Sequence, residues 1–161
     1  LKIGLSGIES PHIYAKYLSR LNLPRINVQI KHNYFYSDFH RYEQVFFNHA
    51  PRYWAYGISA SGLKLSKTEY REKSYVSLTR PLLYHDDLMT NILYDKLKTL
   101  VEINTLNSLY ELSVAYAMQE DRLFGIIVGP SSVEQLGGIY SFIKHRDPYS
   151  IDLSLLDKSL S

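Results

Sequence analysis

The sequence predicts an α/β protein built around a parallel β-sheet. Short apolar runs that are typical of strands alternate with longer segments whose apolar residues recur at helical spacing. The predicted order is strand, helix, strand, helix, strand, loop, helix, helix, strand, helix. This alternation is typical of a parallel sheet, because each helix returns the chain to the end of the sheet where the next strand begins.

Most of the predicted elements have a clear start or stop signal. The first strand covers residues 2–5 and ends at Ser6 and Gly7. Ser10 followed by Pro11 indicates a helix start, since proline is favoured at the first helical position. The remaining predicted strands cover residues 26–31, 53–61 and 124–128. The remaining predicted helices cover residues 39–49, residues 86–101, a segment that begins at Thr105, and residues 131–144.

The chain is expected to form a single partial domain over residues 1–161. Residues 62–85 are rich in Lys, Ser and Tyr and contain no convincing strand, so we expect a long loop excursion there. Leu1 is not a methionine, and the first predicted strand begins almost at the first residue of the chain. Both features suggest that the chain lacks its first part. Four strand–helix units fit a small open sheet, and they equally fit half of a (β/α)8 barrel.

Composition excludes several classes of protein and site. The net charge of +2 gives no strong case for a nucleic acid or an anionic membrane as partner. No long apolar run or signal peptide is visible, and a cytoplasmic location is expected. Cysteine is absent, which excludes disulfides and thiolate chemistry. His-x-x-x-His spacing is missing, so we expect no metal site of the zinc-helix type.

The segment IIVGPSSVEQL at residues 126–136 is the most informative motif. An apolar run stops at Gly129 and Pro130, two serines follow, and a helical pattern then begins. Free backbone N–H groups and the helix dipole favour an anion such as phosphate at such a helix start. The alternative is that the glycine and serines serve only as turn and cap residues.

Three further strand ends extend this motif into a family resemblance. IGLSG ends the first strand, HNYFY follows the second and ISASGL ends the third. In this order, and followed by IIVGPSSVEQL, they resemble the C-terminal half of the aldo/keto reductases. The branch of galactose and arabinose dehydrogenases is the most similar. The resemblance implies a (β/α)8 barrel of which this chain supplies about four βα units.

The resemblance also implies a binding site for NADP or NAD. Ser6, with Gly7 beside it, would hold the nicotinamide amide. The second strand would contribute His32, which we prefer, or Gln29 in an alternative register. Ser61 and Leu63 would contact the pyrophosphate. Gly129 and Ser131 would contact the phosphate at the adenosine end, and Gln135 would lie on the adenine side.

The chain departs from the family pattern after Gln135. Gly137, Gly138 and Ile139 stand where the family has two acids and an asparagine that contact adenine, so we expect phosphate binding to be better supported than adenine recognition. Each glycine also weakens a helix by about 1 kcal/mol relative to alanine. No basic residue for a 2′-phosphate stands near Ser131, so the choice between NAD and NADP stays open.

The resemblance implies no catalytic residue in this chain. The family uses an Asp, Tyr, Lys and His tetrad, and the resemblance places it in an N-terminal half that the chain lacks. The expected activity of the whole protein is hydride transfer between nicotinamide and an aldose or another carbonyl substrate. One alternative is a non-catalytic relative that serves as a binding or regulatory subunit. Another is a half-barrel that pairs with a second copy of itself.

Overall fold

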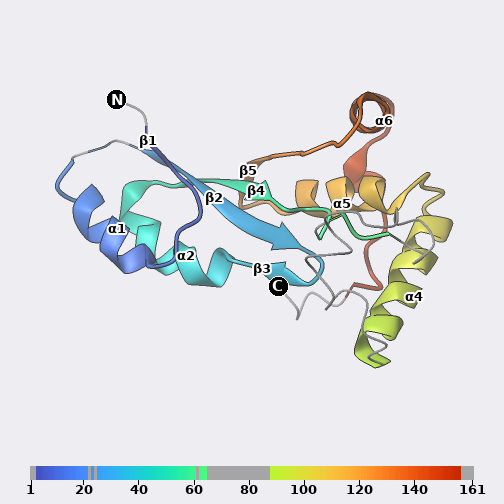
Figure 1. Ribbon diagram of the computed structural model, residues 1–161, viewed down its shortest axis with the longest axis horizontal. Coiled ribbons are helices and arrows are strands. Elements are labelled where there is room, and N and C mark those ends of the chain that lie inside the picture. The colour runs from blue at the N-terminus through green and yellow to red at the C-terminus, as the bar shows by residue number, and fades with distance from the viewer. Residues whose placement is uncertain (1–2, 22, 24, 61, 65–87, 157–161) are drawn as a thin grey trace.

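The computed structural model describes residues 3–21, 23, 25–60, 62–64 and 88–156 (Figure 1). The described part is an α/β structure with a parallel sheet, as the alternation of elements predicts. Most of the expected loop over residues 62–85 lies outside the described residues.

Four parallel strands form the sheet in the order in which they occur along the chain. They are β1 (Ile3–Leu5), β2 (Ile26–Asn33), β4 (Arg52–Tyr56) and β5 (Leu123–Ile126). A two-residue strand, β3 (Tyr36–Ser37), folds back antiparallel onto the end of β2. Sequential order without a reversal distinguishes this sheet from a doubly wound sheet, where the order reverses at a switch point.

Most helices begin near the predicted positions, but the one predicted from Thr105 begins at Leu109, because Thr105 has a left-handed φ of 51°. The four strands are joined and followed by α1 (Pro11–Leu18), α2 (Phe39–Phe46), α4 (Leu88–Ile103), α5 (Leu109–Met118) and α6 (Val133–His145), with short 3-10 turns at Phe47–His49 and Pro148–Ser150. Ser108 and Ser132 cap α5 and α6 through their side chains, which accept hydrogen bonds from backbone N–H groups in the first turn. Pro11 opens α1 as expected.

The third strand is shorter than the sequence predicts. We expected residues 53–61, but β4 ends at Tyr56. Gly57 then adopts a positive φ of 63°, and its carbonyl accepts the N–H of Ala60. A left-handed residue followed by a tight turn cannot continue a strand, because the backbone leaves the extended region there.

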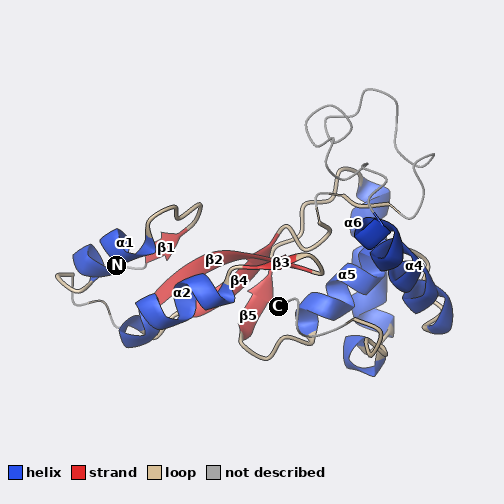
Figure 2. Cartoon of the chain, turned by 90° about the horizontal axis from the view of Figure 1, so that it is seen from below, coloured by secondary structure: helices blue, strands red, loops and turns tan. Residues whose placement is uncertain are grey.

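Helices α1, α2 and α5 pack against the sheet, while α4 and α6 pack against α5. Ile26, Val28 and Ile30 of β2 are fully buried and form one apolar cluster with α1 and α2. Ala55 of β4 points to this same face and belongs to the cluster built around α5. Figure 2 shows the sheet in the middle, with α1 and α2 toward one end and α4, α5 and α6 toward the other.

The opposite face of the sheet is polar and uncovered in the described part of the chain. Alternation along β2 places Asn27 and Gln29 on this face, and both are only partly buried. Trp54 of β4 pairs in register with Gln29 and lies on the same side. Strands β1 and β5 are the two edges of the sheet, and neither has a second partner among the described strands. The uncovered face and the two edges therefore remain available to further structure or to ligands.

Gly125 allows the Trp54 indole to lie flat across β5. A Cβ added at Gly125 would come within 2.8 Å of Trp54 Cζ3, which is closer than real Cβ contacts. The ring of Phe124 packs edge-on against the indole, with centroids 5.0 Å apart. A β-bulge between β4 and β5 at this point adjusts the register around the large ring.

We predict that Gly125→Ala destabilises the protein by about 1–3 kcal/mol, because the methyl group would displace the indole. Gly138→Ala is the matched control: a Cβ there meets no atom within 4 Å, so the substitution should stabilise α6 by roughly 0.5–1 kcal/mol. Urea unfolding measures both effects, and the fluorescence of Trp54, the single tryptophan, reports the ring's displacement. Equal stability and equal emission for Gly125→Ala and wild type would contradict this packing.

Candidate functional site

A hollow of about 360 Å³ lies on the uncovered face, at the carboxyl end of β1. Gly4, Leu5 and Ser6 line one side of it, Asn27 and Gln29 line its centre, and Trp54 and Ile127 line the other side. The carboxyl ends of parallel strands are the usual position for ligand sites in α/β proteins, because the strand ends and following loops meet there.

Ser6 and Gln29 form the polar centre of this hollow. The Ser6 hydroxyl donates to Gln29 Oε1 across 2.8 Å. Gly7, with a positive φ of 61°, turns the chain sharply after Ser6, so that the serine stands at the end of the strand. The Gln29 amide nitrogen retains two N–H donors, and the Ser6 oxygen retains acceptor capacity. The pair therefore offers both a donor and an acceptor to one ligand.

Trp54 forms a rigid aromatic side of the hollow. Its indole Nε1 donates to Asn27 Oδ1 across 3.1 Å, which fixes the orientation of the ring in its plane. Phe124 packs edge-on against the indole, and Gly125 has no side chain, so the indole can approach the β5 backbone closely. A planar ligand beside Ser6 and Gln29 would have this indole nearby, and aromatic rings favour stacked or edge-on contacts.

His32, the preferred nicotinamide contact from the sequence, points to the helix-covered face. Its side chain is 1% exposed and stacks on Tyr116 of α5, with centroids 5.2 Å apart. Its Nδ1 hydrogen-bonds with the Ser37 hydroxyl at 3.0 Å, while Nε2 has no partner in the described structure. Strand parity explains the difference, since His32 lies three residues from Gln29 and so faces the other side. The structure joins Gln29, not His32, to Ser6.

The two positions from ISASGL are not seen at the hollow. Leu63 is buried in the cluster around α5, and its backbone N–H donates to the Ser59 carbonyl. The Leu63 N–H is therefore already hydrogen-bonded within the turn and is not a free donor for a phosphate. Ser61 lies outside the described residues.

Ser131 and Gln135 meet at the start of α6. The backbone N–H and the hydroxyl of Ser131 both donate to Gln135 Oε1, at 2.7 and 2.9 Å. The Ser132 hydroxyl accepts from the Gln135 N–H at 3.2 Å and caps the helix. These residues and Gly129 are exposed. An anion could reach this helix start only after the Gln135 side chain turned away.

Asn27 and Trp54 line the hollow, although neither lies in the sequence motifs from which the site was predicted. The alternation of Ile26, Val28 and Ile30 with polar residues could have identified Asn27, because it defines which positions face away from the core. In the described part of the chain, no group of three His, Asp or Glu side chains is arranged to hold a metal ion. None of the described helices combines the length and apolar character that a bilayer span needs.

Burial lowers the pKa of His32 below its ordinary value; nearby Glu120 opposes this shift and Arg122 reinforces it. The folded state therefore holds fewer protons on His32 than the unfolded state. The stability that neutral His32 provides is present above its unfolded pKa of about 6.5 and is lost as pH falls through the lower folded value.

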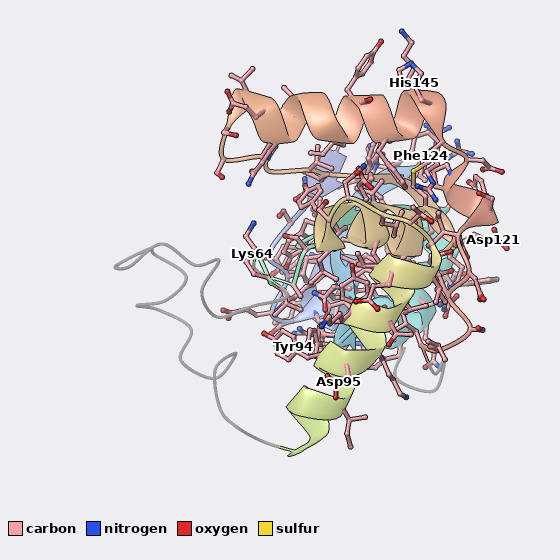
Figure 3. The ribbon with its side chains drawn as sticks, turned by 90° about the vertical axis from the view of Figure 1, so that its right-hand side faces the viewer. Lys64, Tyr94, Asp95, Asp121, Phe124 and His145 are labelled. Carbon is pink, nitrogen blue, oxygen red and sulfur yellow. The ribbon has the colours of Figure 1, made fainter. Side chains whose placement is uncertain are left out.

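We therefore predict that the free energy of unfolding falls between pH 7.5 and pH 5.5, and that His32→Phe flattens this dependence. Urea unfolding at several pH values measures it. His145→Phe, at the exposed end of α6, is the control and should keep the wild-type profile (Figure 3). An unchanged profile in His32→Phe would show that other groups cause the dependence.

Comparison with known proteins gives matches among solved structures alone. No family model matches the chain, and no curated protein matches it. Among solved structures, the chain is similar to the glycerol dehydrogenase AKR11B4 from Gluconobacter oxydans, an aldo/keto reductase, with 12% identity and a TM-score of 0.48. The match covers 94% of this chain and 60% of that one. A likeness at this level does not establish the family, so any functional assignment rests on the residues of the sheet.

Proposed function

We propose that this chain is the cofactor-binding half of an NAD(P)-dependent oxidoreductase of the aldo/keto reductase type. The observation that supports this most directly is the Ser6–Gln29 pair beside Trp54, on the uncovered sheet face at the carboxyl end of β1. The strand-end motifs IGLSG, ISASGL and IIVGPSSVEQL support the same assignment by resemblance. The substrate class is an aldose or another aldehyde and its alcohol.

The Ser6–Gln29 pair has the donor and acceptor pattern that a primary carboxamide requires. The carboxamide oxygen of nicotinamide would accept from the Gln29 amide N–H groups, and its NH₂ would donate to Ser6 Oγ. Gln29 replaces His32 in this proposal, because only Gln29 shares a face and a hydrogen bond with Ser6. Trp54 would limit where the nicotinamide ring can lie.

The phosphate end of the cofactor is proposed at the start of α6. Gly129 leaves space there, since a Cβ would meet nothing within 4 Å, and Ser131 provides an N–H and a hydroxyl. Binding would exchange the Gln135 side-chain oxygen for a phosphate oxygen on the same two donors. Ser61 and Leu63 remain family-based candidates for the pyrophosphate.

When bound, the dinucleotide would supply the hydride for reduction of the carbonyl group. This chain's residues would hold and orient the nicotinamide. The proton for the carbonyl oxygen would come from a Tyr assisted by Lys or His in the other half of the barrel. That half would add its strands to β1 and β5, the two edges that have no second partner among the described strands.

The test uses the protein encoded by the complete gene. Trp54 should transfer excitation energy to bound NADPH or NADH, because it lines the hollow. Ser6→Ala and Gln29→Leu should each weaken cofactor binding by about 2–10-fold, the equivalent of one neutral hydrogen bond to a ligand. Ser141→Ala, an exposed serine on α6, is the matched control and should bind normally. Equal binding by all three variants would contradict the assignment of the hollow.

A second candidate function is a non-catalytic, aldo/keto reductase-like binding or regulatory subunit. Gly137 and Gly138 favour it, because they are exposed and offer no side chain to an adenine base. Cofactor turnover with a panel of aldoses separates the candidates. Binding without turnover in the complete protein would support the subunit.

A further inference from the structure

A second and larger hollow lies in the helix layer, between α1 and α2. It measures about 600 Å³, and it shares no residue with the hollow at Ser6 and Gln29. Its polar lining comes from the loop after β1, the first turn of α1 and the first two turns of α2, namely Glu9, Ser10, His12, His40, Arg41 and Gln44. Helices α1 and α2 lie side by side and contact each other, so the two sides of the hollow are held together (Figure 1).

Arg41 is an exposed side chain at the edge of this hollow. Its Nη2 donates to the backbone carbonyl of Glu9, which ties α2 to the loop after β1. The guanidinium also lies over the ring of Tyr42, 5.5 Å from its centroid. Tyr42 is buried and donates its hydroxyl to the Ile8 carbonyl at 2.8 Å, so the same loop is held a second time. A guanidinium has five N–H donors; the Glu9 carbonyl uses one, and the Tyr36 hydroxyl is a second partner of Arg41.

Further donors surround Arg41. His12 and His40 come from different helices, and each imidazole can donate an N–H to an anion. The Ser10 hydroxyl makes no capping hydrogen bond to α1. The Glu9 carboxylate is the acidic group in the lining and opposes an anion. The hollow thus combines one guanidinium, two imidazoles and a hydroxyl with one carboxylate.

We propose that this hollow binds the phosphate group of a small phosphorylated metabolite, of the size of a sugar phosphate. The planar guanidinium matches two phosphate oxygens at once, and charge-assisted hydrogen bonds of this kind are about twice as strong as neutral ones. The volume is within the range of small-molecule sites, roughly 300–1,000 Å³. Gln44 and Ser10 can bond to the hydroxyl groups of the metabolite. This site is additional to the proposed cofactor site and does not depend on it.

The test titrates the protein with inorganic phosphate, ribose 5-phosphate and ribose at constant ionic strength. The C2–H signals of the histidines are followed by NMR. The His12 and His40 signals should shift with both phosphates and stay in place with ribose, while the His145 signal stays in place throughout. Ribose 5-phosphate should bind more tightly than inorganic phosphate, because its hydroxyls reach the polar lining. Signals of His12 and His40 that do not move with either phosphate would overturn the proposal.

Two substitutions with opposite expected effects on ribose 5-phosphate affinity make the test specific. His40→Asn should weaken ribose 5-phosphate binding about tenfold, as expected for a hydrogen bond to a charged group. Glu9→Gln should tighten it about two- to fivefold, because it removes the opposing charge. His145→Asn is the control. If Glu9→Gln weakens binding, or His40→Asn leaves it unchanged, the site is elsewhere. Ser6→Ala should bind ribose 5-phosphate normally, which separates this result from any result on the cofactor.

Discussion

The alternation of side chains along β2 determines most of this structure. Ile26, Val28 and Ile30 bury themselves against α1 and α2, and this apolar contact requires the intervening positions to face away. Asn27 and Gln29 are consequently presented on a polar face that no described helix covers. A one-residue shift in register would bury these amides and expose the isoleucines, so the contact also specifies which residues can reach a ligand.

Packing across the sheet then shapes the hollow on that face. Trp54 is too large to share its face with a side chain at the neighbouring position on β5, and Gly125 removes the conflict. Asn27 holds the indole from one side and Phe124 from another. The result is a rigid aromatic surface next to the adjustable Ser6–Gln29 pair. A site of this type can hold a planar group with a carboxamide, which is the basis of the functional proposal.

Sequence reasoning predicted the arrangement of this fold better than the chemistry of its site. The four parallel strands and the helix start at Pro11 follow from local patterns and capping residues, and the structure has both. The short strand β3 was missed, because two residues carry no periodic signal. Preferring His32 over Gln29 rested on motif alignment, whereas the face of each residue depends on parity along the strand. The Trp54–Gly125 contact joins distant residues, and no local pattern predicts it.

The most direct measurement is the crystal structure of the protein encoded by the complete gene, with NADP or NAD bound. We predict that the nicotinamide carboxamide lies within hydrogen-bonding distance of Ser6 and Gln29, beside the Trp54 indole and inside a closed barrel. His32 should stay buried against Tyr116. A cofactor bound away from the Ser6–Gln29 pair, or a sheet whose polar face is covered by helices, would contradict the central claim.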